Sequence, residues 1–311
     1  MITLGVNSLN RMRLYKYIIY ILCVVVITTI ANSEDIKSKL EGKVYSKFDE
    51  FVNNIGEGIA ENLRDNENLK YLDFSVNVHE GFSPSYEIQT VNKLIEYKDG
   101  ALFNQTNLRS HSGETTLNFG VGKRKLLNDD TLLLGSNLFL DYQFDESHLR
   151  YGVGLEAISN TLDLIGNYYN AISGFKGTDS GREKVLDGYD VQLNYHIFNK
   201  TKTDLFVQLF EWENPNSTYE EKGEKFGLNT MFGNLALQIG YTNDNKNNDG
   251  LFGSIKLVVP LGKEKNTNNS NGSDNNINSL SVRNKLYAPV QRENKIKVVK
   301  ISKSGVKISG F

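Results

Sequence analysis

The sequence predicts an all-β protein: a twelve-stranded antiparallel transmembrane β-barrel preceded by an N-terminal helix. Two adjoining segments, 134–142 and 149–156, alternate between apolar and polar residues, as half-buried strands do. Their polar face mixes glycines with charges such as Asp141 and Arg150, whereas the water-facing side of a soluble sandwich is rich in Lys, Thr and Ser. Hydrophobic residues make up only 39% of the chain. That content disfavours a helical membrane protein but suits a barrel, in which every second residue faces lipid.

The first 33 residues have the pattern of a secretory signal peptide. A basic stretch ends at Lys16, an uncharged apolar run covers 17–30, and small residues stand at Ala31 and Ser33, where a signal peptidase reads them. The alternative is an uncleaved inner-membrane anchor, but the run is shorter than the ~20 residues that a membrane span needs. The single cysteine, Cys23, lies in this leader, so we expect no disulfide or cysteine metal site in the mature chain.

Residues 34–68 follow as a predicted helical segment. Between Ile36 and Leu63, apolar residues recur every three or four positions among Lys, Glu and Asp, which is the period of an amphipathic helix. Its polar face carries both signs of charge, whereas helices that lie on a membrane surface are rich in Lys and Arg on that face. We therefore expect this segment in the periplasm, packed on the barrel or on a neighbour.

From residue 69 to 262 the period changes from about 3.6 to 2, which marks the predicted outer-membrane barrel. In the segment 188–198, for example, Tyr, Val, Leu and Ile alternate with Asp, Gln, Asn and His. The candidate strands cover 71–79, 85–96, 101–110, 115–126, 131–144, 147–157, 162–171, 188–198, 203–212, 225–232, 235–242 and 251–261.

The connections between these strands alternate in length. Bacterial outer-membrane barrels have short periplasmic turns and longer outer loops, so this alternation is expected if the first strand runs outward. The turn at 145–146 is short although it falls on the outer side. The short periplasmic turns would be 128–130, 160, 199–202 and 233–234, and the long outer loops 173–187, 214–224 and 243–250.

Residues 263–311 are predicted to form a polar linker and a basic extended tail. The stretch 263–279 is rich in Asn, Ser, Gly and Lys and cannot build a core. In the tail from Leu280 onward, Lys and Arg outnumber a lone Glu293, and the apolar residues between 296 and 308 could form extended structure. A basic tail could bind nucleic acid, but a solvated linker or the start of a lost passenger fits better. The net charge of −2 gives no global argument for nucleic acid.

Several motifs have the spacing of one family. They are the stretches 116–122, 126–130, 135–156, 167–170, 186–190 and 289–293. Through them the chain resembles, from about Leu69 to Arg292, the barrel domain of the intimin/invasin-like inverse autotransporters. The resemblance implies a barrel whose lumen is crossed by the segment after the last strand, which leads a C-terminal adhesin to the cell surface.

The immunoglobulin-like passenger and the peptidoglycan-binding LysM module of that family are missing from this sequence. The expected function is therefore an outer-membrane translocator that displays or anchors a C-terminal segment in adhesion, with its passenger absent or truncated. The alternative is a small-solute pore or a structural barrel without cargo.

The polar faces of the strands predict a lumen lined by charges and amides. If the turn at 145–146 pairs Phe144 with Ser147, Asp141 lies directly opposite Arg150, and opposed charges attract. These groups could line the path of a polypeptide or merely solvate a plugged interior. The inward glycines, Gly120, Gly122, Gly135, Gly152 and Gly154, could admit a threaded segment or bend the wall. The predicted lumen-lining residues are Asn137, Asp141, Arg150, Glu156, Asp190, Gln192, Asn194, His196, Gln238 and Lys256.

We predict no enzyme, no cofactor and no metal site. The four histidines are scattered and fit no metal spacing. No GxSxG, HExxH or P-loop motif occurs. Tyrosines at strand ends, together with Trp212, suggest aromatic girdles at the membrane interfaces. The expected partners are outer-membrane lipid, the barrel-assembly machinery and a receptor on a host or neighbouring cell, with no nucleic acid.

Overall fold

A computed structural model describes residues 66–178, 181–197, 202–215, 217–259, 261, 281–302 and 307–310. The predicted signal peptide (1–33) and linker (263–279) lie outside the described residues, as does most of the predicted helical segment. Its last residues, 66–68, form a turn that leads into the first strand. Among the described residues, no helix is long and apolar enough to cross a bilayer.

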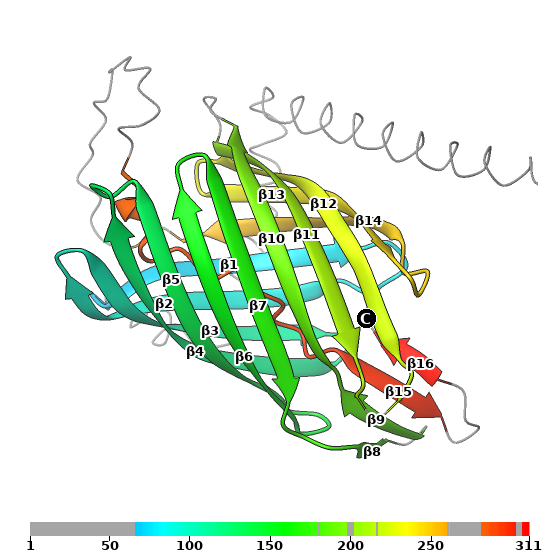
Figure 1. The fold of residues 1–311 in the computed structure, drawn as a ribbon. Helices are drawn as coiled ribbons and strands as arrows, with labels where there is room; N and C mark the ends of the chain where they lie inside the picture. The colour runs from blue at the N-terminus through cyan, green and yellow to red at the C-terminus, as the bar shows by residue number, and fades with distance from the viewer. Residues whose placement is uncertain are drawn as a thin grey trace, which may run out of the picture.

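The predicted barrel of twelve antiparallel strands is confirmed (Figure 1). Neighbouring strands follow the order β1-β14-β13-β12-β11-β10-β7-β6-β5-β4-β3-β2, so the pairing of β1 with β14 closes the wall. Most predicted boundaries differ by one to three residues from the observed ones, and the largest difference is the earlier start of β12. The strands are β1 Leu69–His79, β2 Ser85–Tyr97, β3 Gly100–His111, β4 Glu114–Leu127, β5 Leu132–Gln143, β6 His148–Ser159, β7 Leu162–Ala171, β10 Asp187–Ile197, β11 Lys202–Glu213, β12 Glu220–Phe232, β13 Leu235–Asp244 and β14 Gly250–Val258.

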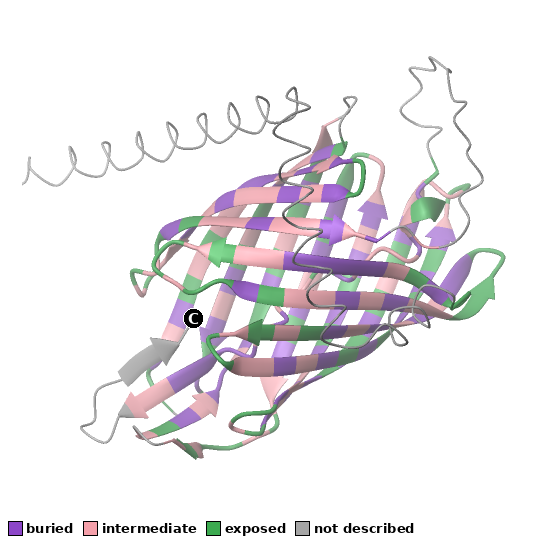
Figure 2. Ribbon diagram, turned by 180° about the vertical axis from the view of Figure 1, so that it is seen from behind, coloured by how far each residue is buried: buried purple, intermediate pink, exposed green. Residues whose placement is uncertain are grey.

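Apolar side chains face outward and polar ones inward along the central strands. Leu138 and Leu155 are 51% and 69% exposed, whereas Asn137 and Glu156 are buried. The same alternation of exposed and buried residues runs along many strands in Figure 2. It follows from the pleat, which sends successive side chains to opposite faces of the wall. The outward belt is therefore the surface that meets lipid.

The two ends of the barrel differ in their connections. At one end, here called the short-turn end, β4 joins β5 through Asn128, Asp129 and Asp130, all with positive φ. Asn and Asp tolerate this left-handed conformation better than other side chains, which makes the tight turn possible. At the other end, the long-loop end, the connection 172–186 contains two short strands, β8 Lys176–Thr178 and β9 Gly181–Val185. The sequence predicted this segment only as a loop.

From residue 281 the described chain starts at the short-turn end and crosses the lumen. Residues 281–297, here called the plug, begin with the short 3-10 helix η2 Arg283–Lys285 and continue without regular structure. Beyond the long-loop end, β15 Val298–Ser302 pairs with β9, and β16 Lys307–Gly310 pairs with β15. Figure 1 shows this path in orange and red, from η2 through the barrel to a four-stranded sheet of order β16-β15-β9-β8. The predicted threading of the lumen is confirmed.

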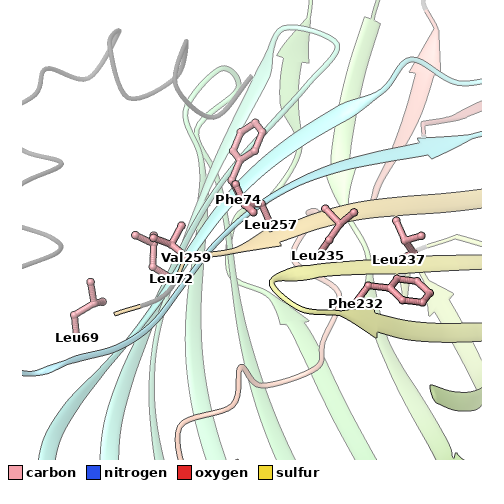
Figure 3. Close-up of a cluster of buried hydrophobic side chains, with 8 residues drawn as sticks. All are labelled: Leu69, Leu72, Phe74, Phe232, Leu235, Leu237, Leu257 and Val259. Atoms are coloured by element: carbon pink, nitrogen blue, oxygen red, sulfur yellow. The ribbon is translucent and has the colours of Figure 1, made fainter. Parts of the chain in front are cut away.

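An apolar cluster stabilises the seam where the wall closes (Figure 3). Phe74 of β1 lies opposite Leu257 of β14, and both side chains are almost fully buried. Leu72 and Leu235 pack into the same cluster. Burial of one such side chain contributes about 1.5–3 kcal/mol. Backbone pairing and apolar contacts thus hold the seam together.

The prediction of an aromatic girdle is wrong for Trp212. Tyr168 and Tyr189 are 47% and 45% exposed on the outer surface, but Trp212 is 2% exposed. Its indole packs on Tyr169 inside the barrel, with ring centroids 5.0 Å apart. Trp212 pairs in register with Gly188 of β10, where a side chain would collide with the indole. Trp212 lies inside the barrel because it belongs to the inward-facing set of residues on β11, and Gly188 leaves the space that its indole occupies.

Candidate functional site

The plug is held at the short-turn end by ion pairs to the wall. Arg283 Nε donates to Asp130 Oδ2 at 2.8 Å in the turn between β4 and β5. Lys285 Nζ lies 3.2 Å from Asp163 Oδ1 and 2.9 Å from His196 Nε2. His196 also contacts Asp163 directly, with 3.0 Å between Nε2 and Oδ1. The charges at the start of the plug are thus matched by groups from three connections or strands of the wall.

Arg124 of β4 binds carbonyl oxygens at the end of η2 and just after it. Its Nη1 donates to the carbonyls of Lys285, Leu286 and Ala288 at 3.2, 3.0 and 2.5 Å. Its Nε and Nη2 donate to the two carboxylate oxygens of Glu156 at 2.6 and 3.0 Å. Both side chains are almost completely buried. A guanidinium suits this position because its planar set of donors binds a carboxylate and several carbonyls at once.

At the centre of the lumen, Asp141 binds two arginines. The plug residue Arg292 donates to both of its carboxylate oxygens at 2.8 Å, and Arg150 Nε donates to Oδ2 at 2.8 Å. All three side chains are at most 1% exposed. Arg292 also stacks over the ring of Phe139, 4.2 Å from its centroid, and Arg150 Nη2 donates to the carbonyl of Glu293 at 2.8 Å. Such dense pairing is what makes buried charges tolerable.

The plug backbone finds its partners on wall side chains. The Glu293 N–H donates to Tyr169 Oη at 2.7 Å, and that hydroxyl donates to Asp190 Oδ2 at 2.7 Å. Asn167 Nδ2 donates to Asp190 Oδ1 at 2.9 Å and to the Gln291 carbonyl at 3.0 Å. A buried backbone group without a partner is costly, so these wall groups make it possible for irregular chain to lie inside the barrel.

Amide side chains complete this set. The Val290 N–H donates to Gln105 Oε1 at 2.7 Å, and Asn118 Nδ2 donates to the Asn294 carbonyl at 2.9 Å. A side-chain amide can donate and accept hydrogen bonds at once. It can therefore bind the N–H or the C=O of a peptide backbone, whatever side chains that peptide carries. The wall therefore binds the backbone of the plug through Arg124 and these polar side chains, and Asp141 adds a charge-assisted contact to the side chain of Arg292.

The predicted lumen-lining residues all lie on the inward face, in three relations to the plug. Those that contact it directly are Asp141, Arg150, Gln192, Asn194 and His196. Glu156 and Asp190 act through Arg124 and Tyr169. Asn137 borders Gly154, Gln238 donates to Asn229, and Lys256 lies 3.4 Å from Asp73. That these groups line the path of a moving polypeptide stays a prediction.

Several residues of the site were missed by sequence reasoning, above all Arg124, Tyr169 and Arg292. The alternation of β4 carries a signal for the first, because Arg124 shares the inward face with Gly120 and Gly122. The sequence gives no signal for the pairing of Arg292 with Asp141, since the two residues lie 151 positions apart.

The inward glycines mostly make room within the wall. A side chain at Gly120 would collide with the ring of Phe139, and one at Gly122 with the ring of Phe103. Gly152 is the one of the five predicted inward glycines that meets the plug, because a Cβ there would come within 2.9 Å of Arg292 Nη2. These glycines are explained by the close approach of other groups. Most of those groups are large side chains on adjacent strands, and only a minority belong to the plug.

The plug leaves the barrel beside the loop that carries β9. The Leu186 N–H donates to the Lys297 carbonyl at 2.9 Å, and Lys297 Nζ lies 3.1 Å from Glu221. Glu183 of β9 contacts His148 at 2.9 Å and Lys300 of β15 at 3.5 Å. Burial acts to raise the pKa of Glu183, but the His148 hydrogen bond and the Lys300 charge outweigh it, and the pKa lies below its ordinary value. Glu183 is therefore an ionised contact in the docking of β15.

A cavity of about 500 Å³ remains beside the plug. It lies against β1, β2, β12, β13 and β14, whereas most of the contacts above are made by β3 to β10. Within the described part of the chain, no group of three or more His, Cys, Asp or Glu side chains could hold a metal ion. The functional geometry is thus that of a polar tunnel around an extended peptide.

Comparison with known proteins gives a family and a fold. The family model for the inverse autotransporter β-domain matches residues 29–294. The putative attaching and effacing protein homolog of Escherichia coli (strain K12) is 28% identical over 126 residues, which span 39% of this chain and 42% of that protein. A solved chain from a study of the in-meso crystallization of membrane proteins has a TM-score of 0.61 at 20% identity, covering 73% of this chain and 98% of that one. The KdgM porin has a TM-score of 0.44 at 10% identity, covering 62% of this chain and 99% of the porin.

Proposed function

Because the chain belongs to the inverse autotransporter β-domain family and is an outer-membrane barrel, we propose that it displays its own C-terminal segment at the cell surface. In this proposal the short-turn end faces the periplasm and the long-loop end faces outward, as is usual for bacterial barrels. The predicted helical segment 34–68 then lies in the periplasm.

The observation that carries the proposal is the path of the plug. It enters at the short-turn end, passes Asp141 at the centre, and continues into β15 beyond the long-loop end. Its contacts are made along the whole height of the wall, by groups that reach both its backbone and its side chains. A tunnel of this kind suits a chain that is passed through the lumen and then kept there.

We further propose that the displayed segment serves adhesion, by contact with a receptor on a host or neighbouring cell. The support is the similarity to an attaching and effacing protein homolog. Outer-membrane lipid would surround the apolar belt, and the barrel-assembly machinery would insert the protein.

An epitope tag after Phe311 tests the display. We expect antibody to label this tag on intact cells. Two matched insertions calibrate the result: a tag in the β13–β14 loop after Asn247 should be labelled on intact cells, and one between Gly233 and Asn234 should be reached only after lysis. If the tag after Phe311 behaves like the tag at Gly233, the chain does not display its C-terminus and the proposal is wrong.

A further inference from the structure

The plug fills the lumen unevenly, and the space that it leaves has a definite place. The cavity of about 500 Å³ is bounded on one side by plug residues and on the other mainly by β1, β2, β12, β13 and β14, with one or two residues each from β3, β10 and β11. Its lining runs from Tyr71 and Lys256, towards the short-turn end, to His79 and Phe252 at the long-loop end. The cavity thus follows most of the length of β1. Its volume corresponds to more than ten waters at ~30 Å³ each.

The charged lining is mostly cationic. The positive side chains are Arg109, Lys225, Lys256, Arg292, Lys295 and Lys297, and the negative ones are Glu87 and Glu293. Asp73, Asp141 and Glu221 pair with three of these cations, but they are buried in the wall and do not line the cavity. The lining itself carries more cations than carboxylates, and after the three wall carboxylates are counted a small net positive charge remains.

Three of the cations cluster in one place. Arg109 of β3 and Lys225 of β12 lie 3.6 and 3.7 Å from the two carboxylate oxygens of Glu293. The plug residue Lys295 adds a third cation, and among the described residues its Nζ has no carboxylate within 4.0 Å. Glu293 thus pairs with two cations, and the backbone N–H of Lys295 donates to its Oε1 at 3.0 Å. Polar groups such as Gln208 and Asn229 line the same cavity.

We propose that this cavity is a water-filled passage beside the plug that conducts small inorganic anions in preference to cations. Rings of Arg and Lys select anions in pores, because the field of one sign of charge is focused between low-dielectric walls. The amide and hydroxyl groups of the lining can replace part of an anion's hydration shell. This activity is separate from display of the C-terminal segment, since it needs the space that the plug leaves free.

Planar bilayers with the purified full-length barrel under a tenfold KCl gradient, with the dilute side near 0.1 M or below to limit screening, test the proposal. We expect small current steps whose reversal potential reports a chloride-over-potassium permeability ratio of about 3 or more. Lys295→Glu should bring this ratio to about 1 or below, because it reverses the charge without breaking an ion pair. Lys225→Gln should reduce it less. The control is Lys70→Glu, an exposed residue near the start of β1, which should leave the ratio unchanged.

Heat-modifiable mobility on gels verifies that each variant is folded. A folded barrel that passes no current, or one that prefers potassium, overturns the proposal. So does a Lys295→Glu barrel with the ratio of the parent protein. None of these outcomes changes the labelling of a tag after Phe311, so the passage and the display stand or fall separately.

Discussion

Asp141 is the residue at which plug and wall converge. Its carboxylate is fully buried and accepts from Arg292 of the plug, from Arg150 of the next strand and from Asn118 of the preceding one. A single unit of negative charge therefore offsets two guanidiniums. The remaining positive charge is stabilised by cation–π interactions, because Arg292 stacks on the ring of Phe139 and Arg150 on that of Tyr169.

Replacing Asp141 by Asn should destabilise the folded barrel strongly. The change keeps the shape of the side chain but leaves Arg150 and Arg292 buried without a counter-ion, which costs about 3–5 kcal/mol. We expect the temperature at which the barrel loses its compact mobility on gels to fall markedly. Asp129→Asn is the matched control, because Asp129 is exposed in a turn whose left-handed φ Asn also tolerates. Equal transition temperatures for the two variants would mean that Asp141 does not hold the plug.

At the scale of single residues, the sequence predicts those contacts that are made between the two strands of one hairpin. The alternation of 134–142 and 149–156 and the short turn between them are enough to place Asp141 opposite Arg150, and the register confirms this pair. The third partner, Arg292, belongs to a segment without periodicity, so neither strand pattern nor spacing could assign it a place. The misplacement of Trp212 has a similar cause, because its burial depends on Gly188 of a neighbouring strand.

At the scale of elements, the most informative pair is β9 with β15. The basic tail was expected to be extended, and β15 is a strand, but its partner lies in a segment predicted as a loop. The strands β8 and β9 are three and five residues long, too short to carry a period of their own. They become strands through their pairing with each other and with β15, which a sequence pattern does not contain.

The pairing of β15 with β9 should weaken in acid. The pKa of Glu183 is lowered below 4.5, so its ionised form stabilises the docked state at pH above 4.5, and this stabilisation is lost as the pH falls through the lowered pKa. Lys300 keeps its charge throughout, since the carboxylates of Glu114 and Glu183 raise its pKa against the lowering by burial. Hydrogen-exchange protection of the β15 amides, corrected for intrinsic rates, should therefore fall between about pH 5.5 and about pH 3.

Glu183→Gln should flatten this pH dependence, because the amide has no proton to bind. Glu213→Gln, at an exposed site at the end of β11, should leave it intact. If β15 of the Glu183→Gln barrel loses protection in acid as fully as that of the parent protein, another group controls the docking.

At the scale of the whole molecule, the plug is bound mainly to one side of the wall. The strands from β3 to β10 make most of the contacts with the plug, whereas β1, β13 and β14 face mainly the cavity. The barrel itself was predictable, because twelve alternating segments with turn-forming residues between them have few other ways to pair all of their backbone polar groups within lipid. The one-sided position of the plug in the lumen was not predictable, since it depends on which strands of the wall offer partners to residues 281–297.

Removal of residues 281–311 should open the lumen. The strands of the wall remain paired, and Asp141 retains Arg150, so we expect the truncated chain to keep a heat-modifiable fold of lower stability. Its conductance in planar bilayers should rise several-fold over that of the full chain, because the plug no longer occupies the lumen. Removal of residues 303–311 alone leaves the plug and all of β15 in place and should change the conductance little. Similar conductance for both truncations would show that the plug does not obstruct the lumen.

The one-sided placement of the plug also decides how the protein bears mechanical tension. A pull on the chain beyond Ser302 first meets β9, whose backbone bonds to β15 lie across the direction of the pull and share it. The rest of the force reaches Lys297, which is paired with Glu221, and then Arg292, which transmits it to Asp141. From Asp141 it spreads to β4, β5 and β6, which are paired along their whole length. The β1–β14 seam lies on the far side of the cavity and receives little of the force. Tension on the chain would therefore act mainly on fully paired strands and little on the β1–β14 seam.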